Sequence, residues 1–179
     1  PIESVVASDG TPGFVSQIVP GRRLDKRLRE GPITVVEAFN IATGLGRSLV
    51  AAHNQHFIHG DLRPANVLRV HRDEKSRYAG RAVLLWHSLY RLRSRVTVDS
   101  SADWLMYRPR QDLIGEGRQA SADTDTFALG AILYECLSGE PAFGGDFEEM
   151  VLENLSRPPP PLPARPETGL SAEIAARID

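Results

Sequence analysis

The feature that most constrains the fold is a long amphipathic helix followed at once by a polar segment and then by short apolar stretches. Apolar residues recur at spacings of three and four between Ala38 and Ala52, which predicts a helix with one buried face. Thr34 and Glu37 precede this pattern as a T-x-x-E capping box, so the helix should begin there. The strand-like stretches of the chain are few and short, so we expect a mainly helical α+β fold.

Short strands are predicted on both sides of this helix. Two apolar stretches, Val67 to Val70 and Ala82 to Leu85, are separated by the polar segment HRDEKSRYAG, which predicts a β-hairpin with a long loop. Nearer the start of the chain, Phe14 to Val19 predict another strand. A Pro-Gly pair ends it before a short basic helix that carries Leu24 and Leu28.

The second half of the chain contains a further predicted helix. The stretch DTDTFALGAILYECLSG has helical apolar spacing, with an aspartate expected to open the helix and Gly139 to close it. From Trp86 to about Ala122 the pattern is irregular and rich in arginine and aspartate, which predicts a long loop. Asp146 should start another short helix, residues 156–168 form a Pro-rich connector, and Ser171 should cap a last helix.

Composition restricts the kinds of partner. The chain of 179 residues is 41% hydrophobic, which suffices for one core, and its net charge of -2 gives no global field that would attract nucleic acid. Cys136 is the only cysteine and lies in an apolar stretch, so we expect it in the core. No apolar run reaches the ~20 residues that cross a bilayer. We therefore expect a cytoplasmic protein, or the cytosolic domain of a larger protein with or without a membrane anchor.

The segment FIHGDLRPANVLRV, residues 57–70, carries the pattern with chemical meaning. It resembles the catalytic loop of protein kinases, H-R-D-L-K-P-x-N followed by a strand. In phosphoryl transfer one carboxylate accepts the proton of the substrate hydroxyl, and an amide oxygen ligates magnesium. The resemblance implies that Asp61 is the catalytic base, that Asn66 is the magnesium ligand, and that Arg63 replaces a lysine near the transferred phosphate.

The resemblance extends along nearly the whole chain. Residues 1–179 are expected to form part of a kinase-like domain, namely the large lobe with most of the small lobe missing. FVSQIVPGRRL looks like the strand and hinge that bind adenine, which implies hinge positions at Gln17 and Val19 and a pocket floor at Leu68. TFALGAILYECLSGEPAFGG is similar to the central helix of bacterial serine/threonine kinases, where Asp125 would accept hydrogen bonds from the catalytic-loop backbone. ATP, magnesium and a protein substrate or partner are what the resemblance implies.

Three departures from the family pattern bear on catalysis. Trp86, His87 and Ser88 stand where the family has its metal-binding D-F-G, and an indole offers magnesium no hard oxygen ligand. Gly60 replaces the arginine before the catalytic aspartate, and R-P-R at residues 108–110 replaces A-P-E. Trp86 argues against the magnesium and ATP that the resemblance implies, and we expect this chain to be inactive as it stands.

The sequence leaves three functions open. A pseudokinase with a regulatory or scaffolding role follows from the residue at Trp86. An active serine/threonine kinase, which would use Asp61 and Asn66, follows from the intact D-L-R-P-A-N loop. A small-molecule phosphotransferase follows from H-G-D, which aminoglycoside phosphotransferases also carry, although the predicted helix after residue 120 favours the protein-kinase branch.

Simpler interpretations stand beside these. His53, His56 and His59 are spaced at three, but His56 and His59 fall outside a continuous helix and no carboxylate or cysteine supports them as ligands, so a structural role outweighs a metal site. Asp61 and Asn66 would also serve as plain turn residues. The matching residues around them favour an inherited site.

Overall fold

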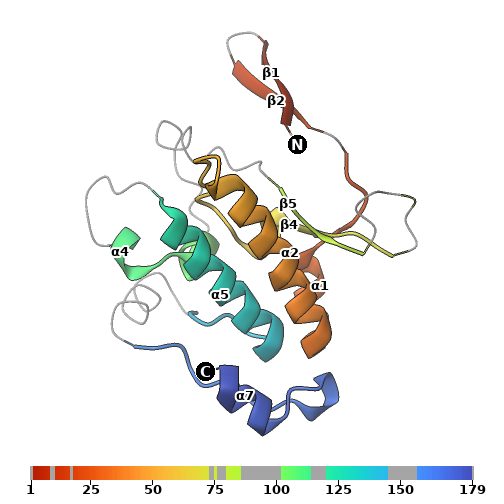
Figure 1. Ribbon diagram of the computed structural model, residues 1–179, viewed down its shortest axis with the longest axis vertical. Coiled ribbons are helices and arrows are strands. Elements are labelled where there is room, and N and C mark those ends of the chain that lie inside the picture. The colour runs from red at the N-terminus through yellow and green to blue at the C-terminus, as the bar shows by residue number, and fades with distance from the viewer. Residues whose placement is uncertain are drawn as a thin grey trace.

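The computed structural model describes residues 2–8, 11–16, 18–72, 75, 80–85, 102–113, 120–144 and 157–178. Its helices are α1 (Leu24–Leu28), α2 (Val35–His53), α4 (Arg110–Leu113), α5 (Ala122–Ser138) and α7 (Ala172–Ile178), with short 3-10 turns at Pro64–Asn66, Ala102–Tyr107 and Pro166–Thr168. Its strands are β1 (Ile2–Ser8), β2 (Thr11–Ser16), β3 (Arg22–Arg23), β4 (Val67–Arg69) and β5 (Ala82–Leu84). Figure 1 shows the predicted α+β, mainly helical architecture.

The strands form two small antiparallel sheets. β1 pairs with β2, and a second sheet has the order β3-β4-β5. The predicted hairpin is confirmed, since Val67 lies opposite Leu84 and Arg69 opposite Ala82. The strand expected from Phe14 to Val19 instead spans β2 and ends at Ser16, which pairs with the first residue of β1. Ile18 and Val19, at the far end of the expected strand, lie in coil.

The helix α2 begins as the capping pattern predicts. Thr34 is the N-cap, and its side chain accepts a hydrogen bond from the backbone N–H of Glu37. The reciprocal half of the expected capping box is replaced, because the Glu37 carboxylate lies 2.7 Å from Nε of Arg69 in an ion pair. The buried face of the helix consists of Ala38, Ile41, Leu45 and Leu49.

The helix α5 begins differently from the prediction. Its N-cap is Ser121, which exchanges hydrogen bonds with Thr124 in a capping box, so the expectation that an aspartate opens the helix was wrong. The aspartates lie inside the first turn, where Asp123 is exposed and Asp125 is buried. Gly139 ends the helix as predicted, with a φ of 81° that favours glycine.

One core joins the two long helices. Figure 1 shows α2 and α5 side by side, with β4 and β5 beside α2. A Cβ on Gly44 would lie 3.7 Å from Ala82 and one on Gly46 would lie 3.7 Å from Leu129, which are ordinary contact distances, so this packing does not require glycine. Cys136 is buried in this core, as expected.

The remaining predictions have mixed outcomes. The segment read as a long irregular loop contains helical turns in its described part, at Ala102–Tyr107 and in α4. Ser171 caps α7 by accepting a hydrogen bond from the N–H of Ile174, as predicted.

The helix expected at Asp146 lies outside the described residues. Within the ranges that the structure covers, no helix is long and apolar enough to span a membrane.

The proline-rich segment has neither helix nor strand over residues 157–164. It is nevertheless attached to the domain, because Leu162 is buried in the same core as α5. Leu170 and Ala175 belong to that core as well. The last part of the described chain thus packs against the helices before it.

Candidate functional site

The three predicted catalytic residues lie together in the loop that joins α2 to β4. The side-chain nitrogen of Asn66 donates hydrogen bonds to the backbone oxygen of Asp61 at 2.7 Å and to its Oδ2 at 3.2 Å. On the other side of the carboxylate, Nε of Arg63 lies 3.4 Å from Oδ1. Because the nitrogen of Asn66 is committed to Asp61, its side-chain oxygen is the atom that could meet a cation.

The backbone of this loop is held by Asp125 of α5, as the sequence predicted. Asp125 is 0% exposed, and its carboxylate accepts hydrogen bonds from the N–H groups of His59 at 2.9 Å and Gly60 at 2.8 Å. The ring Nε2 of His53, at the end of α2, lies 2.8 Å from the same carboxylate. A buried carboxylate with three donors is well compensated, so the loop conformation is tied to both long helices.

His59 connects the loop to the end of β5. Its Nε2 lies 3.0 Å from the backbone oxygen of Leu85, and its Nδ1 accepts a hydrogen bond from the N–H of Asp61. Burial lowers the pKa of His59, and the bond to Leu85 partly opposes that shift. These contacts fit a neutral ring with its hydrogen on Nε2.

Leu85 is bonded to the catalytic loop through both of its backbone groups. Besides accepting from His59, it donates its N–H to the backbone oxygen of Asn66 at 2.8 Å. The chain therefore leaves β5 directly beside the catalytic loop. The next residues in the sequence, Trp86, His87 and Ser88, lie outside the described residues.

Arg108 is a site residue that sequence reasoning missed. It is 4% exposed, and its Nη2 donates to the backbone oxygen of Gly60, which has a φ of 72°. Its Nη1 lies 3.3 Å from the carboxylate of Asp112, which also accepts a hydrogen bond from the hydroxyl of Thr124. The guanidinium packs over the ring of Trp104, 5.3 Å from its centroid. A positive group thus reaches the catalytic loop from the segment before α4.

The R-P-R tripeptide marked this position without indicating which arginine is buried. Arg110, the first residue of α4, is exposed. Arg108 points inward because a backbone carbonyl far away in the sequence accepts its hydrogen bond. No local pattern in the sequence carries that information.

A second buried polar pair adjoins this segment. The hydroxyl of Tyr107 donates to Oε2 of Glu135 in α5 at 2.6 Å. Burial raises the pKa of Glu135, and the hydrogen bond from Tyr107 opposes the shift. The segment before α4 is therefore attached to α5 by Tyr107 and to the catalytic loop by Arg108.

The predicted adenine-binding residues are only partly described. Val19 is half-buried in the coil between β2 and β3, and Leu68 is half-buried in β4, opposite Val83 of β5. Gln17 lies outside the described residues. The histidines once considered for a metal have separate roles, since His53 contacts Asp125 and His59 contacts Leu85.

A loop that holds an aspartate and an asparagine together, anchored by a buried aspartate on a central helix, defines a kinase-like large lobe. Comparison with known proteins agrees, because the protein kinase domain family matches residues 2–158. The chain belongs to the protein kinase family.

Its relatives include bacterial serine/threonine kinases. Serine/threonine-protein kinase PknB of Mycobacterium tuberculosis is 31% identical over 169 residues, which cover 93% of this chain and 26% of the relative. Probable serine/threonine-protein kinase PknB of Corynebacterium glutamicum is 33% identical over 145 residues, 79% of this chain and 22% of the relative. Serine/threonine-protein kinase PknA of M. tuberculosis is 28% identical over 164 residues, which cover 90% of this chain and 37% of the relative. The chain thus spans well under half the length of these relatives.

Proposed function

We propose that this chain is the large lobe of a pseudokinase, a kinase-like domain that regulates or scaffolds a protein partner rather than transferring phosphate. The observation that carries the proposal concerns Leu85. Both backbone groups of Leu85 are bonded to the catalytic loop, and the residue that follows it in the sequence is Trp86. The family carries its metal-binding aspartate there, and an indole cannot replace that ligand.

The groups around Asn66 do not fit a magnesium ion well. Magnesium prefers several hard oxygen ligands in near-octahedral geometry. Asn66 offers one amide oxygen, and the neighbouring carboxylate of Asp61 already faces Arg63 and the Asn66 amide. Among the described residues, no group of three His, Cys, Asp or Glu side chains is arranged to hold a metal. The groups around Asn66 therefore do not supply the set of oxygen ligands that magnesium-dependent phosphoryl transfer requires.

The contacts of Arg108 support a fixed scaffold. In the family, the arginine replaced here by Gly60 receives an activation-loop phosphate. Here Arg108 bonds the backbone oxygen of Gly60 directly, so the segment before α4 reaches the catalytic loop without a phosphate. Phosphorylation of the activation loop is therefore not needed to hold the segment before α4 against the catalytic loop.

We propose that residues 1–179 form part of one kinase-like domain and that residues 156–168 are a Pro-rich connector inside it. We propose that the domain works in the cytoplasm or on the cytosolic side of a larger protein. A buried thiol at Cys136, whose burial raises its pKa to about 12, suits a reducing compartment because it needs no disulfide partner.

The test uses the full-length protein. We expect ATP with magnesium to give no larger thermal shift than ATP with a chelator, and no phosphate transfer to a general protein substrate. Trp86→Asp, which returns a carboxylate to the metal position, is expected to gain a magnesium-dependent shift. Magnesium-dependent phosphorylation by the unmodified protein, abolished by Asp61→Asn, would overturn the proposal.

An active serine/threonine kinase is the second candidate. It is favoured by the bonds between Asn66 and Asp61, which keep the carboxylate oriented for a substrate hydroxyl. In that case Asp61 would accept the proton and Arg63 would face the phosphate. Adenine would contact the hinge at Gln17 and Val19 and the floor at Leu68. The same phosphorylation assay decides between the candidates, and the family match argues against a small-molecule phosphotransferase.

A further inference from the structure

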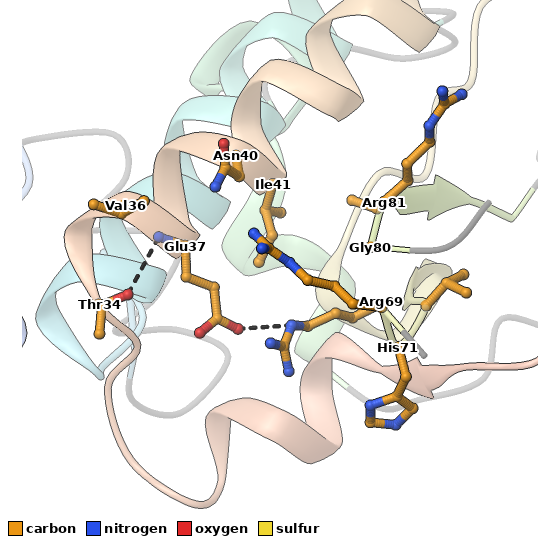
Figure 2. Close-up of a pocket in the computed structure, with 12 residues that line it drawn as sticks. Thr34, Val36, Glu37, Asn40, Ile41, Arg69, His71, Gly80 and Arg81 are labelled. Carbon is orange, nitrogen blue, oxygen red and sulfur yellow. Dashed lines mark hydrogen bonds and ion pairs between the residues drawn. The ribbon is translucent and has the colours of Figure 1, made fainter. Parts of the chain in front are cut away.

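A pocket of about 420 Å³ lies between the first turns of α2 and the β4–β5 hairpin (Figure 2). It is at the opposite end of α2 from His53, which contacts the catalytic-loop anchor Asp125. None of Asp61, Arg63 and Asn66 lines it. The pocket is therefore separate from the candidate catalytic site.

The lining of this pocket is basic, although the protein as a whole is slightly acidic. Three arginines line it, Arg69, Arg72 and Arg81, against one carboxylate, that of Glu37. Glu37 neutralises Arg69 through the ion pair at 2.7 Å. The whole chain has a formal net charge of -2, so the pocket concentrates positive charge locally.

The other two arginines of the lining differ in their ion pairing from the two arginines of β3. In β3, Arg22 is paired with Glu30 and Arg23 with Asp25. Arg72 and Arg81 are exposed, and within the part of the chain that the structure describes neither forms an ion pair. Their charges are available to a partner.

The side chain of Arg72 passes close to Gly80, at the start of the second half of the hairpin. Gly80 has a φ of 72°, a conformation that favours glycine, and a Cβ built on it would lie 3.0 Å from Cγ of Arg72. A side chain at this position would displace the stem of Arg72. Glycine at position 80 therefore leaves room for the side chain of Arg72, one of the two arginines of the lining that form no ion pair within the described residues.

The directions of the side chains indicate what kind of anion fits. Figure 2 shows Arg69 directed toward Glu37, whereas Arg81 and His71 point away from that pair in different directions. Arg81, which no ion pair among the described residues neutralises, thus carries its charge away from the Arg69–Glu37 pair, and charge spread out in this way suits an extended chain with several acidic groups better than one small anion. Val36, which also lines the pocket and is 72% exposed, offers an apolar contact that a peptide could use.

We propose that this pocket is a docking site for an acidic segment of a partner protein, with Arg72 and Arg81 as the principal contacts. The site would give the proposed scaffolding role a point of attachment. It does not depend on that role, because it uses no catalytic-loop residue and would serve an active kinase equally well.

The experiment measures the fluorescence anisotropy of a labelled octaglutamate peptide, with octaglutamine as the uncharged match. We expect octaglutamate to bind and octaglutamine not to bind. The double variant Arg72→Gln with Arg81→Gln should weaken binding by about tenfold or more, and added salt should weaken it further. The matched control, Arg22→Gln with Arg23→Gln, removes the same charge from arginines that are already paired and should change the affinity little.

A further variant, Gly80→Ala, tests the geometry at unchanged charge. It should also weaken binding, because it displaces Arg72, and far-UV circular dichroism would establish that the variants remain folded. Three results would overturn the proposal: no binding of octaglutamate, equal binding of octaglutamine, or equal losses in the two double variants. All of these readouts are independent of ATP, so they cannot be confused with failure of the pseudokinase proposal.

Discussion

A single buried carboxylate organises the catalytic loop. Asp125 accepts hydrogen bonds from two consecutive backbone N–H groups, those of His59 and Gly60, and it also contacts the ring of His53. Hydrogen bonds to a charged acceptor are stronger than those between neutral groups. Leaving such donors buried without an acceptor costs free energy. The shape of the loop therefore depends on one side chain from a helix that follows much later in the sequence.

Asp125→Ala should accordingly destabilise the domain strongly. We expect the free energy of unfolding to fall by about 3–5 kcal/mol, because three donors lose a charged acceptor at a fully buried site. Asp125→Asn keeps one oxygen acceptor and should cost less. Chemical denaturation measures both. The control is Asp123→Ala, an exposed residue of the same helix turn, which should cost less than about 1 kcal/mol; equal losses at the two positions would contradict this account.

Glu135 should make stability depend on pH. Burial raises its pKa above the usual 4.5, so between 4.5 and the raised value the folded state binds more protons than the unfolded state. Its contribution is therefore fully present below the unfolded pKa of about 4.5 and is lost as the pH rises from there through the folded pKa. Relative to Glu135→Gln, which does not titrate, the unmodified protein should become less stable as the pH rises.

The measurement compares denaturation curves of the two proteins from about pH 4 to pH 7. Glu30→Gln provides a contrast, because the hydrogen bond from Arg22 lowers the pKa of Glu30. Its effect should be small, since the pair is exposed, and of opposite sign. A difference between the unmodified protein and Glu135→Gln that does not change with pH would refute the assignment for Glu135.

At the scale of elements, the sequence predicted what is encoded locally. The start of α2 followed from Thr34 and the end of α5 from Gly139, because a cap is a contact between near neighbours in the chain. The β4–β5 hairpin followed from two apolar stretches. β3 was not foreseen, since Arg22 and Arg23 become a strand only by pairing with β4, which lies far along the chain.

The candidate site shows the same division. The family resemblance placed Asp61 and Asn66 in one catalytic loop and predicted that Asp125 bonds the loop backbone, whereas the contact between Asp61 and Asn66 is a finding of the structure. Arg108 escaped prediction because its burial is decided by distant partners, the carbonyl of Gly60 and the carboxylate of Asp112. Contacts between segments that are distant in sequence leave no periodic signal.

Arg108 should connect the segment before α4 to the catalytic loop. Arg108→Ala leaves the Asp112 carboxylate, already mostly buried, without its cation, and should lower the free energy of unfolding by about 3–5 kcal/mol. Arg108→Lys keeps the charge but loses the planar fork, so an intermediate loss is expected. Chemical denaturation gives the loss, and faster hydrogen exchange at the Asp61 amide, which shares a peptide group with the Gly60 carbonyl, should accompany it.

The control is Arg110→Ala, because Arg110 is exposed in the same segment. It should change stability by no more than about 0.5 kcal/mol. If Arg108→Ala left exchange at the Asp61 amide unchanged, the guanidinium would not be what links the two segments.

At the scale of the molecule, the end of the described chain shares one core with the two long helices. The core that contains Leu45 of α2 and Ile132 of α5 also contains Leu162 and Leu170. Elements that share a core are expected to unfold together. The last segment should then contribute to the stability of the catalytic loop.

Leu170→Ala tests this expectation. Leu170 is fully buried, so its truncation should lower the free energy of unfolding by about 2–5 kcal/mol. Ile174→Ala, at a residue that is 38% exposed, should cost much less. Far-UV circular dichroism reports the helices, and tryptophan fluorescence reports Trp86 and Trp104, of which Trp104 packs on Arg108 near the catalytic loop. Both transitions should move together, because a shared core gives a cooperative transition. A shift seen only by circular dichroism would mean that the end of the chain unfolds as a unit of its own.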